Sequence, residues 1–215
     1  ILFFGALQAI VGWWMVKSGL NQDPYVSQYR LSFHLTNAII ILSLLLLMTL
    51  NQFKVIKQKK IKSIFINRLF LTSLLLTLIT IISGSFVSGT DAGKSFNTFP
   101  LMNGQFFPDG YLYLDNFLNN FFENTITIQF NHRWLAIFTF FWTLGVVGYS
   151  LSNKIPILHQ IACYIITIII TLQIIIGILT LINHVPITLA SIHQGNAILL
   201  YCSLLITTFL FSKRT

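Results

Sequence analysis

Charge is scarce in this sequence. Only 8% of its 215 residues are Asp, Glu, Lys or Arg, and just five of them are acidic. A soluble domain usually carries charge on about a quarter of its residues, so the composition excludes an ordinary water-soluble fold. Hydrophobic residues make up 55% of the chain, and the mean hydropathy is +0.78. The composition therefore indicates an integral membrane protein, whose main surroundings are the lipid bilayer.

Apolar runs long enough to cross a bilayer as helices recur along the whole chain. The segments between them are too short to build a separate soluble core, so the predicted fold class is all-α: a polytopic transmembrane helix bundle. We predict six spans, at about residues 1–16, 31–50, 66–88, 131–151, 160–182 and 187–211. The first span is the shortest and opens on Ile1, so we interpret it as the end of a helix that begins upstream. It has no basic segment or small-residue cleavage site, which disfavours a signal peptide.

The basic residues predict the orientation of these spans. Nine of the thirteen fall on one side of the predicted membrane: Lys54, Lys57, Lys59, Lys60, Lys62, Arg68, Lys154, Lys213 and Arg214. The positive-inside bias makes that side cytoplasmic, or matrix-facing in a mitochondrion. All five acidic residues fall on the other, outer side. The net charge of +8 thus reports topology, and we predict no nucleic-acid partner.

Cysteine is equally scarce. The two that occur, Cys163 and Cys202, fall within the fifth and sixth spans. These spans run in opposite directions, so the two thiols are predicted at different depths, which is poor geometry for a disulfide. We interpret both as packing residues, the usual role of a buried free cysteine.

The sequence contains an internal repeat. "LQAIVGWW" at 7–14 aligns with "LQIIIGIL" at 172–179, and "HLTNAI" at 34–39 aligns with "HQGNAI" at 193–198. The first span therefore resembles the fifth, and the second resembles the sixth. Both copies cross the membrane in the same direction, which makes this a parallel repeat about an axis along the membrane normal.

The repeat predicts more helices than the chain contains. Two spans precede the second copy, whereas none precedes the first. We therefore expect an eight-helix protein of two parallel four-helix repeats, six helices of which are present. Residues 1–65 would be the second half of the N-terminal repeat, with two helices and the basic inner loop, and residues 66–215 the complete C-terminal repeat. The alternative is a six-helix protein with an asymmetric repeat.

Five histidines occur, and topology separates them. His34, His132 and His193 each stand a few residues into an inward-running span, which places all three at a similar shallow depth near the outer face. An ionisable side chain inside a membrane usually points at a cavity or a partner, although a single one is often a helix-packing residue. His159 and His184 are predicted at an inner loop and an outer turn, where solvated or interfacial positions are expected.

The three shallow histidines predict a haem site. No acidic residue lies inside a predicted span, which disfavours a hard-metal site, whereas neutral imidazoles suit a transition metal or haem iron. Haem is preferred because Phe- and Leu-rich helices can surround a porphyrin while two axial histidines hold its iron. His132 and His193 form the predicted axial pair. His34 corresponds to His193 in the repeat, so its partner would lie upstream of Ile1.

Four polar residues accompany these histidines. Asn37 and Asn196 lie one turn after His34 and His193 on the same helix face, where they can orient a ligand or simply bond a neighbouring helix. Arg30 and Arg133 are predicted at the outer rim, where a guanidinium can pair with a haem propionate. Snorkelling to the interface is the alternative for Arg30.

Several longer segments resemble one known family. These are "GALQAIVGWWMVKSGL", "VSQYRLSFHLTNA", "SGSFVSGTDAGKSFNTFPLMNG", "QFNHRWLA" and "ILTLINHVPITLASIHQGNA". They resemble the haem A synthases of the alphaproteobacterial and mitochondrial type, and the resemblance covers essentially the whole chain in order. It implies an eight-helix bundle in a bacterial or mitochondrial inner membrane, with histidine sites near the outer face. It also implies an oxidoreductase that converts the C8 methyl group of haem O to a formyl group, making haem A for cytochrome oxidase.

The resemblance also implies roles for single residues. His132 and His193 match the axial ligands of a haem b cofactor, while His34 matches one ligand of the substrate haem. An important family glutamate lies upstream of this chain, which implies that the chain alone is inactive. Haem O is the implied substrate. Haem O synthase, an electron-transfer protein and a second copy of the chain are the further partners considered.

Two other functions compete with this one. A di-haem b-type electron carrier would share the paired histidines without modifying any substrate. A cofactor-free transporter would share the parallel repeat, which is ordinary in that class.

Overall fold

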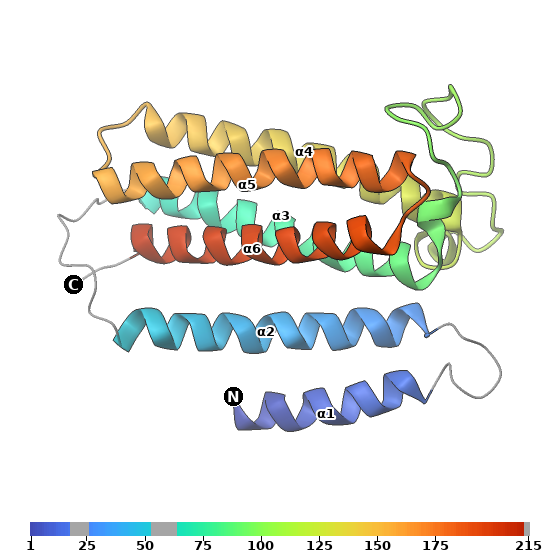
Figure 1. Cartoon of the computed structure of the whole chain (residues 1–215), viewed down its shortest axis with the longest axis horizontal. Helices are drawn as coiled ribbons and strands as arrows, with labels where there is room; N and C mark the ends of the chain where they lie inside the picture. Colours follow the sequence, from blue (N-terminus) through green and yellow to red (C-terminus); the bar gives the residue numbers. More distant parts are fainter. Residues whose placement is uncertain (18–25, 53–63, 213–215) are drawn as a thin grey trace.

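A computed structural model describes residues 1–17, 26–52 and 64–212, and across these ranges the chain is all-α (Figure 1). The long helices are α1 Leu2–Val16, α2 Gln28–Gln52, α3 Ile64–Gly89, α4 Thr125–Leu151, α5 Ile157–Ile182 and α6 Ile187–Ser212. Two short 3-10 helices, η1 Ala92–Lys94 and η2 Leu118–Phe121, lie in the connection between α3 and α4. The predicted fold class is confirmed, and a helix lies at each of the six predicted spans. Five helices, α2 to α6, are long and apolar enough to cross a membrane, whereas α1 has only 15 residues.

The largest error in the predicted boundaries is at the start of α4. The helix begins at Thr125, before the predicted residue 131, because Asn124 caps it. The Asn124 side-chain oxygen accepts from the backbone N–H groups of Ile126 and Thr127, at 3.0 and 3.3 Å. Such a cap satisfies N–H groups that have no partner inside the helix. The helix therefore extends into the polar segment that precedes the apolar run.

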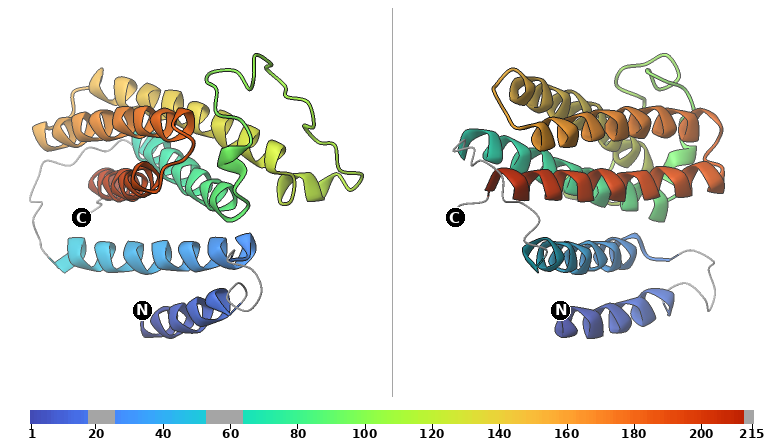
Figure 2. Two further views of the ribbon diagram at one scale, coloured as in Figure 1. Left: turned by 45° about the vertical axis from the view of Figure 1, so that its right-hand side comes forward. Right: turned by 60° about the vertical axis from the view of Figure 1, so that its left-hand side comes forward.

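Helices α3 to α6 form a four-helix bundle. Each neighbouring pair in the order α3, α4, α5, α6 is in contact, and α6 also packs on α3. In this ring α4 and α6 stand diagonally opposite each other, each between α3 and α5. Helix α2 packs on α3 and α6, and α1 packs on α2, so the first two helices form a layer beside the bundle (Figures 1 and 2).

The interior of the bundle combines large apolar side chains with small polar ones. Phe70 of α3 is fully buried and stacks on Phe211 of α6, with ring centroids 5.1 Å apart. Buried Ser73 and Thr143 allow α3 and α4 to approach closely, as small residues do between membrane helices. A hydrogen bond of 2.9 Å between Ser43 and Tyr201 ties α2 to α6. Cys163 is completely buried in the same core, and the thiols of Cys163 and Cys202 are both free.

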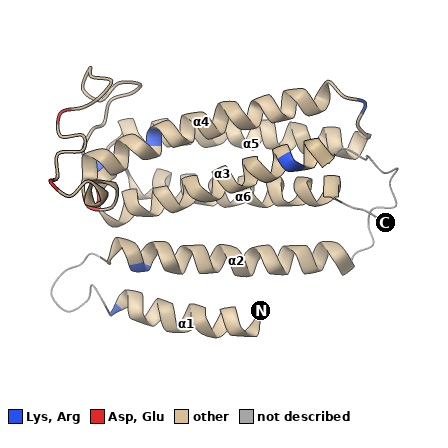
Figure 3. Ribbon diagram, turned by 180° about the vertical axis from the view of Figure 1, so that it is seen from behind, with Lys and Arg blue, Asp and Glu red and all other residues tan. Residues whose placement is uncertain are grey.

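The described acidic residues lie at one end of the bundle. The connection between α3 and α4, residues 90–124, lies at one end, which we call the loop end (Figure 1). It carries every acidic residue within the described ranges, and Figure 3 shows them gathered there. The connection between α4 and α5, which contains Lys154, lies at the opposite end (Figure 1). The lysines of residues 54–62, together with Lys213, Arg214 and Asp23, lie outside the described residues, so the predicted orientation rests on sequence for them.

The stacked pair at the core generates a prediction about stability. Phe70→Ala removes a fully buried ring from between α3 and α6, and we expect it to lower the free energy of unfolding by about 3 kcal/mol. Phe141→Ala is the matched control, because that ring is 66% exposed on α4. Unfolding in detergent would measure both. Equal losses of stability in the two variants would contradict this packing.

Candidate functional site

Three histidines lie at the same level of the bundle. His34, His132 and His193 each stand about two turns after the start of α2, α4 and α6. These three helices run in the same direction from the loop end. The common shallow depth predicted from the sequence is therefore confirmed relative to the helix ends.

Each of these histidines packs over a glycine of the preceding helix. A Cβ atom placed on Gly12 of α1 would lie 3.0 Å from Cε1 of His34. The corresponding distance is 3.2 Å from Gly84 of α3 to His132, and 2.7 Å from Gly177 of α5 to His193. Any side chain at these positions would push against the imidazole. The glycines thus create the space that the rings occupy between paired helices.

In the second repeat, two amide side chains in series lead to His193. Gln173 of α5 places its Nε2 atom 3.2 Å from Nδ1 and 3.4 Å from Nε2 of the imidazole. The Nδ2 group of Asn196 donates to Oε1 of Gln173 at 2.8 Å and to the backbone carbonyl of Ile169 at 3.0 Å. The asparagine therefore makes an interhelical bond and, through the glutamine, reaches the histidine.

The first repeat contains the corresponding glutamine, asparagine and backbone carbonyl around His34. Nε2 of Gln8 lies 3.0 Å from Nε2 of His34. Nδ2 of Asn37 donates to Oε1 of Gln8 at 2.7 Å and to the carbonyl of Phe4 at 3.1 Å. The parallel repeat predicted from two short alignments thus corresponds to the same side-chain contacts in space. Gln8 and Gln173 were not among the predicted site residues, although the shared Leu-Gln-x-x-x-Gly pattern marked both of them.

His132 has different surroundings from the other two. Its Nδ1 atom is buried without a hydrogen-bond partner, and no hydrogen bond to the ring is found within residues 1–17, 26–52 and 64–212. His132 and His193 stand on α4 and α6, which are diagonal in the bundle, and they pack against Gly84 of α3 and Gly177 of α5. Nδ1 of His34 is buried and unpartnered in the same way.

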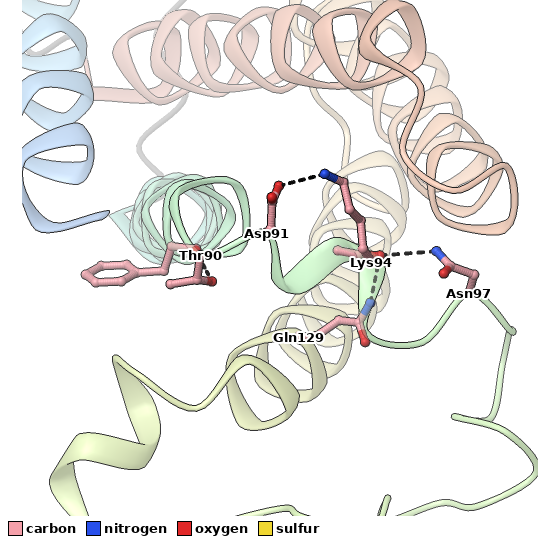
Figure 4. A network of polar contacts seen from close by, with 7 residues as sticks. Thr90, Asp91, Lys94, Asn97 and Gln129 are labelled. Carbon is pink, nitrogen blue, oxygen red and sulfur yellow. Dashed lines mark hydrogen bonds and ion pairs between the residues drawn. The ribbon is translucent and has the colours of Figure 1, made fainter. Parts of the chain in front are cut away.

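Polar side chains bind the start of the connection between α3 and α4 to helices α4 and α5. Gln129 of α4 donates to the carbonyls of Gly93 and Phe96, at 3.1 and 3.0 Å. Asn97 donates to the carbonyls of Gly93 and Leu181, at 3.2 and 2.8 Å. Figure 4 shows Asn97 and Gln129 converging on one stretch of backbone. The start of the loop is thereby fixed over the end of the bundle that holds the histidines.

The two predicted propionate ligands occupy different places. Arg133 is 9% exposed and donates from Nη1 to the carbonyl of Thr98, at 2.8 Å, and from Nη2 to that of Phe96. Its buried Nε atom has no partner. Arg30 donates to the carbonyl of Trp14 at 2.9 Å, and its guanidinium carbon lies 4.4 Å from the centre of a Trp14 ring. Propionate binding by either arginine stays a prediction.

The predicted solvated or interfacial position is confirmed for His184 and wrong for His159. His184 is exposed in the turn between α5 and α6, as expected. His159 was expected to be solvated or interfacial, but it is only 3% exposed. Its ring packs edge-on against Phe211, with centroids 4.6 Å apart, and Nε2 lies 3.4 Å from the carbonyl of Leu210. The end of α6 covers this side chain, which a count of residues from the loop could not show.

The arrangement suits a group that needs two opposed ligands. Within the described residues, no three His, Cys, Asp or Glu side chains gather as a metal-binding cluster. His132 and His193 are the residues that would hold a haem iron here, and such an iron would supply electron-transfer chemistry. The unpartnered Nδ1 of His132 and the glycines beside both rings fit that use.

These features define a polytopic membrane helix bundle with paired histidines at its loop end. A family model described as "COX15-CtaA: Cytochrome oxidase assembly protein" matches residues 1–205. The chain belongs to this family, which confirms the resemblance found in the sequence.

Individual relatives agree with the family. A protein named heme A synthase from Nitrosospira multiformis is 39% identical over 212 residues, covering 95% of this chain and 58% of the relative. One of the same name from Wolbachia pipientis wMel is 41% identical over 215 residues, covering 100% of this chain and 59% of the relative. The heme A synthase of Bartonella henselae is 39% identical over 199 residues, with 92% and 55% covered. The chain thus spans somewhat more than half the length of the relatives it matches.

The glycines beside the histidines generate a prediction. Gly177→Ala places a methyl group 2.7 Å from Cε1 of His193, and we expect overpacking to cost about 1–3 kcal/mol of stability. Gly145→Ala is the matched control, because nothing lies within 4 Å of its Cβ position. Alanine's better helix propensity should leave that variant neutral or stabilise it by up to about 1 kcal/mol. Thermal unfolding in detergent measures both, and effects of the same sign would contradict the close approach.

Proposed function

We propose that this chain is part of a haem A synthase, an oxidoreductase that converts the C8 methyl group of haem O to a formyl group and supplies haem A to cytochrome oxidase. The observation that supports this proposal is the pair His132 and His193, which stand about two turns into the diagonal helices α4 and α6, each against a glycine of the preceding helix. Membership of the cytochrome oxidase assembly family supports it, as do relatives named heme A synthase.

In this proposal His132 and His193 hold the iron of a haem b cofactor. A haem iron with two imidazole ligands supplies one-electron transfer when bound. The chain itself would position the two rings through Gly84 and Gly177 and enclose the group in an apolar bundle. The apolar interior of this bundle includes Ile166 and Ile170 of α5, which are buried in its core. Arg133 is proposed to serve a propionate through its unpartnered Nε atom.

His34 is proposed to contribute one ligand to the iron of the substrate, haem O. It has the same glycine contact and the same amide partners as His193, which supports a comparable role. Arg30 lies one helical turn before His34 on α2, where it is proposed to pair with a propionate of that haem. Its contact with Trp14 of α1 would orient the guanidinium.

The proposed reaction explains the kinds of residue that the site contains. A methyl group on a porphyrin has no acidic proton, so its oxidation requires electron transfer or an iron-centred oxidant and not side-chain acid–base catalysis. Histidines, amides and glycines therefore suffice to bind and orient the reacting groups.

We further propose an inner-membrane location with the loop end facing outward, in a bacterium or a mitochondrion. Nine of the thirteen basic residues fall on the opposite side in the sequence, which supports this orientation through the positive-inside bias. We also propose haem O synthase and an electron-transfer protein as partners, together with self-association of the chain.

The axial pair yields a direct prediction. His132→Ala or His193→Ala should abolish retained haem b, because one remaining imidazole leaves the iron without its second ligand. His184→Ala and His159→Ala are the controls and should retain it, since neither residue faces the pair. The Soret absorbance per mole of purified protein measures haem content. Equal haem content in all four variants would refute the pairing.

A second prediction separates the candidate functions. Intact protein incubated with haem O through cycles of reduction and oxidation should yield hydroxylated and then formyl products, detected by chromatography and mass spectrometry. Retained haem b without any such product would favour the di-haem electron carrier, which the same histidine pair allows. A purified protein with no Soret band would remove both haem functions and leave the transporter.

A further inference from the structure

A carboxylate from the second repeat meets the start of α2. Glu123 is the only glutamate in the sequence, and it stands directly before Asn124, the cap of α4. Its Oε1 atom accepts a hydrogen bond from the hydroxyl of Tyr29, and its Oε2 atom accepts one from Nε2 of Gln28 at 3.1 Å. Both donors belong to the first turn of α2. Each carboxylate oxygen thus has a donor of its own, which suits an ionised carboxylate.

Aromatic rings and a close backbone contact surround this carboxylate. The ring of Tyr29 packs edge-on against Phe86 of α3, with centroids 5.8 Å apart, and lies 6.3 Å from the ring of Phe122. Phe86 and Phe122 are 5.6 Å apart, so rings from three segments meet. A Cβ atom placed on Gly89 of α3 would lie 2.7 Å from Cα of Gln28. The first turn of α2 is therefore held by α3 and by the connection that follows it. We call Gln28, Tyr29, Phe86, Phe122 and Glu123 the α2 junction.

The internal repeat shows which part of the molecule the α2 junction serves. Alignment of the two repeated histidine phrases places Ile187 and Thr188 of α6 opposite Gln28 and Tyr29. The second copy therefore has neither the amide nor the phenol that bind the carboxylate. A feature found in one copy alone is not needed to pack a helix pair around its histidine. It belongs instead to the contact between the first repeat and the second.

The α2 junction lies close to the proposed substrate site along α2. Arg30 follows Tyr29 directly, and His34 stands about one turn further along the same helix. Helix α1 packs on α2, and α2 packs on α3 and α6. The position of α2 therefore sets where the His34 site lies relative to the bundle that carries His132 and His193.

We propose that Glu123 is a positioning residue for the His34 site. By binding Gln28 and Tyr29 it fixes the start of α2 against the second repeat. It thereby sets the place of the substrate haem relative to the haem b cofactor, without touching either group itself. This inference rests on the proposed function, since it requires that the two histidine sites hold these two haems.

The main test removes the acceptor oxygens. Intact protein is purified from membranes with its haem, and oxidation of haem O is measured per mole of haem b. Glu123→Leu should lower kcat about tenfold, because a small misplacement of reacting groups slows a reaction strongly. The KM for haem O should stay nearly unchanged, since His34 keeps its amide partners within the first repeat. Haem b content should also stay unchanged, because His132 and His193 lie outside the α2 junction.

Two further variants isolate the bond with Tyr29. Tyr29→Phe keeps the ring contacts and removes the hydroxyl, so it should lower kcat in the same direction. Adding it to Glu123→Leu should cause no further loss, because both changes remove one interaction. Asp109→Asn is the matched acidic control, because Asp109 accepts from Gln105 of the same connection, at 3.0 Å, and not from α2. It should leave kcat unchanged.

An exchange of the two groups tests the contact by rescue. Gln28→Glu alone places a second carboxylate against Glu123, and repulsion between like charges should lower kcat. Combining Gln28→Glu with Glu123→Gln restores a donor opposite an acceptor. The Tyr29 hydroxyl can then donate to the amide oxygen at position 123. We expect the combined variant to recover most of the unmodified kcat.

Each outcome has a distinct meaning. An unchanged kcat in Glu123→Leu would overturn the positioning role. A haem b content that falls in step with activity would overturn it too, because Glu123 would then support α4 and not α2. If that variant fails to accumulate, a combined variant no better than Gln28→Glu alone would decide against the proposal. Unmodified protein that retains haem b but forms no hydroxylated or formyl product would defeat the proposed function itself, and this inference with it.

Discussion

The structure depends on one constraint, which is that an imidazole inside a membrane helix must have a partner. A polar ring in hydrocarbon is costly unless it meets a hydrogen-bonding group, a cavity or a metal. His34 and His193 meet an amide at one level of the bundle, whereas His132, at the same level, has no hydrogen-bond partner within the described residues. The glycines beside them, the glutamines of α1 and α5, and the asparagines one turn later all follow from placing these rings between helices.

The same constraint distinguishes the histidines from one another. His159 is covered by the end of α6 and packs on Phe211, so it is accommodated as a core side chain. His34 and His193 are each held by an amide, whereas His132 keeps a buried nitrogen without a partner. Nδ1 of His159 is also buried without a partner, so the level of His132 in the bundle distinguishes it from His159, and not the unpartnered nitrogen alone.

Much of this arrangement could be predicted from the sequence, because membrane spans are long and apolar and a repeated phrase preserves the contacts within a helix pair. His34 and His193 were recognised as counterparts on that basis. The start of α4 was missed because its cap, Asn124, lies in a polar segment, where hydropathy gives no signal. Gln8 and Gln173 were passed over because glutamine is not an iron ligand, and only the fold shows that their amides end at the histidines. The burial of His159 depends on the neighbouring helix and not on its own segment.

A structure of the haem-loaded protein from electron cryomicroscopy tests the central claim most directly. The account predicts one macrocycle between α4 and α6 near the loop end, with His132 and His193 on its opposite faces. A haem bound elsewhere would contradict it, as would a bundle interior closed by side chains between these two histidines.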